Sequence, residues 1–125
     1  MLGNAPVSAV LPVADTAQSK RFYEGILGLR TLFESEGTTY FEAGAGTHLM
    51  IYQRPGSAGE HTAASFQVDD LAAELDALAA KGVHPEHYDM PGIKTDERGI
   101  MAMEGMGRIA WIKDPDGNIL ALSEM

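Results

Sequence analysis

The two halves of this sequence follow one plan, and this repeat constrains the fold more than any other feature. The motif at Val13 that opens a helical stretch returns at Val68, an offset of 55. The motif at Tyr40 returns at Trp111, an offset of 71. The offset grows because the second copy carries about 16 extra residues, which we place in an inserted loop over 89–106. A repeat of this length predicts two modules with the same architecture.

The first half has the pattern of a strand, a helix and three further strands. Apolar residues alternate from Val7 to Val13, which is typical of a strand with one buried face. Asp15 or Thr16 then begins a helix, and Gly28 supplies the left-handed position that ends it. The three later strands are predicted over 31–34, 38–43 and 47–53.

The second half predicts the same βαβββ order. Its elements are a strand over 62–68, a helix over 71–80, a short strand over 84–88 and a final hairpin that turns at 114–118. Residues 54–60 are rich in glycine and proline and separate the halves. We therefore expect one domain made of module one over 6–53, a linker over 54–60 and module two over 61–125.

One βαβββ module is too small to bury both faces of its sheet, so we expect the two to combine into a single α+β fold. Helices would cover one face, and strand alternation would turn the other side chains toward a concave face. Half of those side chains are polar, which favours the wall of a ligand cleft over a core. The predicted concave-face residues are Ser8, Val10, Pro12, His48, Met50, Tyr52, His61, Ala63, Ser65, Gln67, Ile119, Ala121 and Ser123.

Several motifs together resemble the vicinal oxygen chelate superfamily, which includes glyoxalase I, bleomycin resistance proteins, extradiol dioxygenases and fosfomycin resistance proteins. They are the runs 13–15, 22–23, 27–29 and 68–70, and the run from Asp114 to Asn118. The resemblance implies two βαβββ modules that form an eight-stranded, cup-shaped mixed sheet with helices outside. It also implies a homodimer with the ligand cleft in the cup.

Superfamily members that bind a metal place one ligand on the first and last strand of each module. The matching positions here are Ser8, Met50, Ala63 and Ala121. None is a carboxylate or an imidazole, whereas hard divalent cations need oxygen or nitrogen donors. The resemblance therefore predicts no metal at the inherited site and no other cofactor. A typical glyoxalase I activity is not expected.

The leading hypothesis is a metal-independent small-molecule-binding protein of the bleomycin resistance type, whose ligand is cationic or partly planar. The predicted cleft residues are Ser8, His48, Met50, Tyr52, His61, Ala63, Ser65, Gln67, Trp111 and Ala121. The alternative is a metal-dependent lyase, isomerase or dioxygenase with a displaced site that uses His48 and His61. A third possibility is an interaction or ligand-sensing module whose cup is filled by its own side chains.

Other residues fit either a functional or a structural role. Tyr40 and Trp111 occupy equivalent positions and either stack on a planar ligand or belong to the core. The methionines of the inserted loop form a lid, pack beneath the loop or contact a dimer partner. Asp114 is interpreted as the cap of a turn rather than a general acid or base. His84 and His87 are expected at the surface.

The net charge of the chain limits the classes of partner that it is expected to bind. Eighteen acidic against nine basic residues give a net charge of −9, which repels phosphate backbones and anionic lipid. We expect no nucleic-acid partner and no membrane association, and we expect a cytoplasmic protein. The chain has no cysteine, which excludes disulfides, thiolate metal sites and cysteine nucleophiles.

Overall fold

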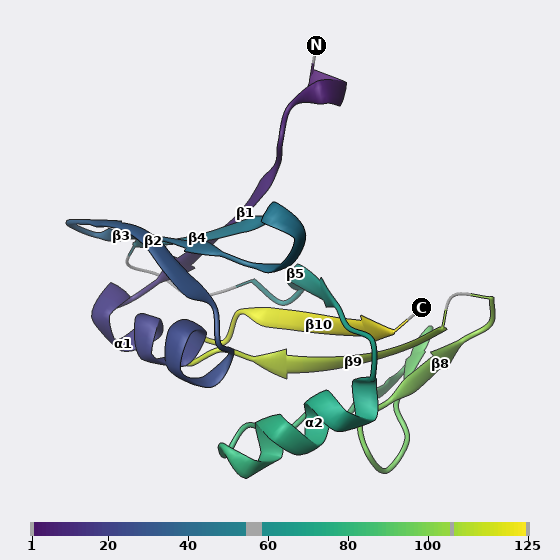
Figure 1. The fold of residues 1–125 in the computed structure, drawn as a ribbon. Helices are drawn as coiled ribbons and strands as arrows, with labels where there is room; N and C mark the ends of the chain where they lie inside the picture. The colour runs from purple at the N-terminus through teal and green to yellow at the C-terminus, as the bar shows by residue number, and fades with distance from the viewer. Residues whose placement is uncertain (1, 55–58, 106, 125) are drawn as a thin grey trace. The chain divides into compact units, whose positions relative to one another are not determined.

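The computed structural model describes residues 2–54, 59–105 and 107–124 (Figure 1). The chain divides into two compact units, residues 1–58 and 59–125. We call them module one and module two and describe each by itself. Each module holds one four-stranded mixed sheet, so the predicted α+β class is confirmed.

Module one has the strand order β1-β4-β3-β2. Strands β1 and β4 are parallel, and the other neighbours are antiparallel. Figure 1 shows α1 on one face of this sheet. The elements are η1 (Leu2–Asn4), β1 (Ser8–Val13), α1 (Thr16–Lys20), the π-helical turn η2 (Arg21–Ile26), β2 (Arg30–Ser35), β3 (Thr38–Glu42), η3 (Gly44–Gly46) and β4 (His48–Gln53).

The helical segment of module one begins and ends where its sequence predicts. The Asp15 side chain accepts hydrogen bonds from the N–H groups of Ala17 and Gln18, at 2.9 and 3.3 Å, and so caps α1. Past η2, Gly28 has a φ of 80°, a conformation that favours glycine. The segment buries Tyr23 against Phe41, with ring centroids 5.8 Å apart. The remaining core side chains come from alternate strand positions: Leu11, Val13, Leu49 and Ile51.

Module two repeats this arrangement with the order β5-β10-β9-β8, in which β5 and β10 are parallel. Leu71, Leu75 and Leu78 of its helix are buried, and Figure 1 shows the helix along one face of the β9–β10 pair. The elements are β5 (Thr62–Gln67), α2 (Leu71–Ala80), β6 (Asp89–Met90), β7 (Ile93–Lys94), β8 (Met101–Met103), β9 (Gly107–Lys113) and β10 (Ile119–Glu124).

The segment between α2 and β9 differs from the sequence prediction. Residues 84–88, which lie within the described part of the chain, form no strand, and the fourth strand of the sheet is β8. Pro85 has no N–H group to donate. The N–H of Glu86 donates to the carbonyl of Trp111 at 2.8 Å, and the Glu86 carboxylate pairs with Lys113 of β9 at 3.5 Å. The expected inserted loop over 89–106 contains the β6–β7 hairpin and β8.

Across the described ranges, every helix is too short or too polar to cross a membrane.

Candidate functional site

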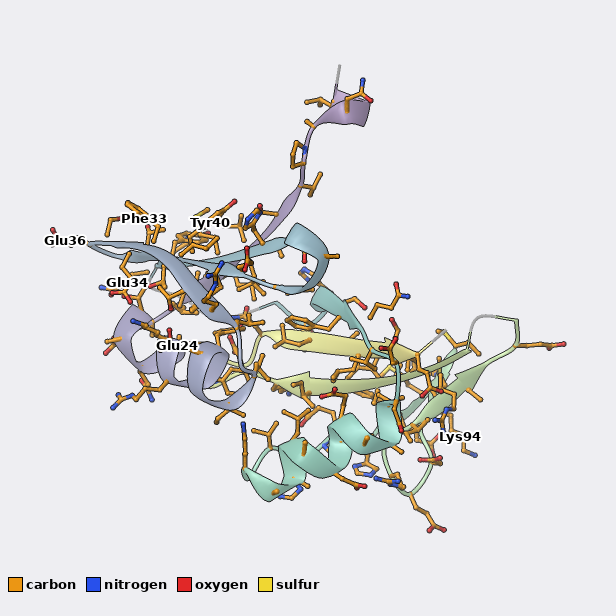
Figure 2. All side chains as sticks on the ribbon, in the orientation of Figure 1. Glu24, Phe33, Glu34, Glu36, Tyr40 and Lys94 are labelled. Carbon is orange, nitrogen blue, oxygen red and sulfur yellow. The ribbon has the colours of Figure 1, made fainter. Side chains whose placement is uncertain are left out.

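The face of module one opposite α1 carries a row of apolar and aromatic side chains, one from each strand. The register pairs Val10 with Met50, Met50 with Tyr40 and Tyr40 with Phe33. Directly paired residues point to the same side of a sheet, so all four lie on this helix-free face. Figure 2 shows Phe33 and Tyr40 on this side and Glu34 on the α1 side.

Tyr40 lies across the sheet instead of standing upright on it. Its hydroxyl is 2.8 Å from the Ser8 hydroxyl, although β4 separates β3 from β1. Neighbouring strands are about 4.8 Å apart, so the phenol must span the width of β4 to reach Ser8. Its ring stacks on the His48 ring at a centroid distance of 5.2 Å and an interplanar angle of 15°. The structure thus brings Ser8, Tyr40 and His48 into one cluster.

The next row of the helix-free face is polar. Ser8 is paired with His48, His48 with Glu42, and Glu42 with Arg30. The guanidinium of Arg30 donates to the Glu42 carboxylate at 2.7 Å, so this acidic group is neutralised within the row. The face therefore combines an apolar stripe with a stripe of hydroxyl, imidazole and ion-paired groups.

Tyr52 occupies a third row of the same face. It is paired with Pro12 and Thr38, and its hydroxyl accepts a hydrogen bond of 3.4 Å from the Arg54 guanidinium. This hydrogen bond and the electrostatic interaction with the Tyr52 side chain raise the pKa of Arg54, which stays charged at any physiological pH. Each module-one residue of the predicted cleft (Ser8, His48, Met50 and Tyr52) is thus on the helix-free face of this module.

The equivalent face of module two is buried at Ala121 and Trp111 but exposed at Ser65 and Gln67 of β5. The register places Ser65, Ala121 and Trp111 in one row, and Gln67 two positions further along β5. Ala121 and Trp111 are only 1% and 7% exposed. Ala63 lies at an irregularity of the β5–β10 pairing.

Two side chains of module two contact the Trp111 indole. Its indole N–H donates to the Thr62 hydroxyl at 3.2 Å. The Tyr88 ring meets it edge-on at a centroid distance of 5.5 Å, and this burial raises the pKa of Tyr88. Trp111 therefore has a core environment, whereas its counterpart Tyr40 is half-buried.

His61 lies outside the strand that was expected to carry it. Strand β5 begins at Thr62, and His61 is exposed, with its ring against Gly59. His48 belongs to module one and His61 to module two. A site that uses both imidazoles stays a prediction.

The four inherited metal positions do not provide suitable donors for a divalent cation. The Ser8 hydroxyl is hydrogen-bonded to Tyr40, Met50 offers a thioether, and Ala63 and Ala121 offer methyl groups. Among the residues described, no three histidine, aspartate or glutamate side chains gather as a metal-binding group. We therefore derive no chemical step through a metal.

Three further residues that the sequence analysis considered, Asp114, His87 and His84, lie outside the rows described above. Asp114 is buried and accepts hydrogen bonds from the N–H groups of Asp116 and Asn118, at 2.9 and 2.8 Å, which confirms the interpretation as a cap. His87 is hydrogen-bonded to the Glu97 carbonyl at 3.1 Å. His84 is exposed, as expected.

The segment with the inserted residues is fastened to its own module. The Tyr88 N–H donates to the Thr95 hydroxyl at 2.9 Å, and Arg98 pairs with Asp76 of α2 at 2.7 Å. Hydrogen bonds from the Ile100 and Arg98 N–H groups lower the pKa of Asp96 in the same segment. Met90 is exposed, and Met106 lies outside the described residues.

The sequence prediction did not assign three residues that the structure places on these faces. Phe33 was missed because a bulge at Leu32 in β2 changes which side chains face outward. Thr62 was missed because the irregularity at Ala63 brings it level with Ile119. Tyr40 was left open, and its alignment with Trp111 in the repeat was the available signal.

The chain belongs to the Glyoxalase/Bleomycin resistance protein/Dioxygenase superfamily, whose family model matches residues 6–122. This confirms the resemblance to the vicinal oxygen chelate proteins. A comparison with curated proteins found no match.

Solved structures share the fold over nearly the whole chain. A glyoxalase/bleomycin resistance protein from Streptomyces sp. CB03234 is 25% identical, with a TM-score of 0.68 and coverage of 96% of this chain and 100% of that one. TnmS3, an antibiotic binding protein from the same strain, is 24% identical, with a TM-score of 0.68 and coverage of 99% and 98%. A mutant of the fosfomycin resistance protein FosX from Listeria monocytogenes, complexed with Mn(II) and a dihydroxypropylphosphonic acid, is 17% identical, with a TM-score of 0.67 and coverage of 95% and 89%.

Proposed function

We propose that this protein binds a small organic molecule without a metal ion, at a site lined by the helix-free faces of its sheets. The observation that carries this proposal is the cluster of Ser8, Tyr40 and His48. In it, hydroxyl and imidazole groups lie beside apolar side chains at a position where metal-binding relatives carry a ligand. Such a mixture of apolar surface and few polar groups is typical of small-molecule sites.

The charge of the chain and one structural neighbour support a choice of ligand class. A net charge of −9 favours a cation over an anion through long-range attraction. TnmS3, which has the same fold, is an antibiotic binding protein. We therefore propose a cationic or partly planar compound, as in the sequestration of an antibiotic. The residues proposed to line the site are Ser8, His48, Met50, Tyr52, His61, Ala63, Ser65, Gln67, Trp111 and Ala121.

Native mass spectrometry and calorimetry on untagged protein test this function. The protein is first treated with a chelator and its metal content is measured. It is then screened against bleomycin and a panel of other cationic, partly planar compounds. Saturable binding at one site per chain with no metal present is the expected result. A bound metal in stoichiometric amount, required for binding, would instead favour the metal-dependent alternative that uses His48 and His61.

A homodimer and a cytoplasmic location are part of the proposal. Light scattering coupled to size-exclusion chromatography distinguishes a dimer of 13.4 kDa chains from a monomer. Fractionation of the source cells tests the location.

A further inference from the structure

The two modules present their equivalent aromatic residues in different ways. Trp111 is 7% exposed and contacts Thr62 and Tyr88 of its own module. Tyr40 is half-buried, and its neighbour Phe33 in the same row is 60% exposed. Val10, in the same row, is 47% exposed, and contiguous exposed apolar surface is one mark of a binding groove. Tyr40 and Phe33 of module one therefore form an aromatic surface that the described residues of this module leave partly accessible.

The orientation of Tyr40 prepares it to hold a flat molecule. Its ring stacks on His48 and its hydroxyl is bonded to Ser8, so the side chain is fixed at both the ring and the tip. A fixed ring loses little conformational entropy when a ligand stacks on it. When two hydroxyls bond to each other, one donates and the other keeps its own hydrogen free to donate. The pair thus has one O–H group to offer to an acceptor atom.

The surroundings of this surface favour a conjugated cation. Glu42 is neutralised by Arg30, whereas Glu36, in the turn after β2, forms no ion pair with any residue that the structure describes. Figure 2 shows Glu36 and Phe33 toward the same end of the β2–β3 hairpin. The faces of aromatic rings attract cations as well. The net charge of −9 adds a long-range preference for a cation over an anion.

We propose that Tyr40 and Phe33 determine ligand specificity by stacking on a flat, conjugated cation, and that the Ser8–Tyr40 hydroxyl pair donates a hydrogen bond to an acceptor atom of that ligand. This inference rests on the proposed function. It adds two residues that the predicted cleft did not include, and it assigns the stacking to module one alone.

Fluorescence titration with proflavine, a flat tricyclic cation, tests the proposal. Tyr40→Leu removes the stacking ring, and we expect the Kd of this variant for proflavine to be about tenfold higher than that of the wild type. Tyr40→Phe keeps the ring and removes the hydroxyl, so we expect a rise of about threefold. Phe33→Leu should also raise the Kd about threefold. Circular dichroism spectra establish that each variant is folded.

Two exposed apolar residues outside the proposed surface provide matched controls. Leu32→Ala changes the bulge residue beside Phe33, and Met90→Ala changes module two; their side chains are 43% and 49% exposed. Both should keep the wild-type Kd within about twofold. Equal weakening in the controls would mean non-specific attraction and would overturn the proposal.

The outcomes separate this proposal from the function on which it rests. Proflavine binding that Tyr40→Leu and Phe33→Leu leave unchanged overturns the proposal and leaves small-molecule binding intact. The same holds if proflavine does not bind while another compound of the panel binds the metal-free protein. If no compound of the panel binds, both the proposal and the proposed function are wrong.

Discussion

Replacing Asp114 by alanine removes the acceptor that organises the turn between β9 and β10. The carboxylate is 4% exposed and accepts hydrogen bonds from the N–H groups of Asp116 and Asn118 and from the Asn118 side-chain amide, the last at 2.8 Å. Asn118 itself is 3% exposed, so water cannot easily replace the carboxylate. The variant leaves buried donors without this acceptor.

The expected cost follows from these contacts. A hydrogen bond to a charged acceptor contributes about 1.5–3 kcal/mol, and the desolvation of the buried carboxylate offsets part of the sum. We expect Asp114→Ala to lower the free energy of unfolding by about 2–4 kcal/mol, a large share of the roughly 5–15 kcal/mol typical of a native protein.

Urea denaturation followed by tryptophan fluorescence measures this loss. Trp111 is the single tryptophan of the chain and lies on β9, so its signal reports the module that contains the turn. Asp114→Asn keeps one acceptor and should lie between wild type and Asp114→Ala. Glu104→Ala, at an exposed turn position, should change the free energy of unfolding by less than about 0.5 kcal/mol. An Asp114→Ala variant as stable as Glu104→Ala would show that the turn does not depend on the Asp114 carboxylate as an acceptor.

Three further predictions concern stability. The Leu71 N–H donates a hydrogen bond to the Glu124 carboxylate and lowers its pKa most, and the hydrogen bond from Arg108 lowers this pKa further. The contribution of Glu124 to stability is therefore present above the unfolded pKa and is lost as the pH falls through the folded value. Glu124→Gln should be less stable than wild type at pH 7, with the gap closing toward pH 3 in urea titrations; a gap independent of pH would contradict this. Phe41→Ala empties a fully buried position, so we expect a loss of about 3–5 kcal/mol by circular dichroism in urea, and a loss below 1 kcal/mol would show that the site collapses. Gly28→Ala forces alanine to a φ of 80° and should cost about 1 kcal/mol in the same assay, whereas unchanged stability would mean that the backbone relaxes.

Local patterns were enough to predict most of the fold. The alternation in β1, the cap at Asp15 and the turn residue Gly28 depend on neighbours in the sequence, and the structure contains all three as expected. The repeat supplied the order of elements in both modules, because two copies of one pattern limit the ways in which either can be interpreted. The strand predicted over 84–88 was wrong because β8, which immediately precedes β9 in the chain, pairs along this edge of β9 instead.

Strand alternation was also enough to predict which face of module one carries part of the candidate site. Strand parity placed Ser8, His48 and Met50 on one face, and the register agrees. Parity says nothing about a side chain that crosses a neighbouring strand, as Tyr40 does, nor about a bulge that turns Phe33 outward. These features arise from packing between strands, which a single sequence does not encode in its spacing.

In the proposed function, the protein holds its ligand through its own hydroxyl, imidazole and aromatic groups without a metal ion. Calorimetric titration of a ligand from the screen into chelator-treated protein, before and after addition of excess Mn²⁺ or Zn²⁺, tests it most directly. We expect the same Kd in both titrations and a higher Kd for Tyr40→Leu in each. Binding that disappears on chelation and returns with the metal would contradict it.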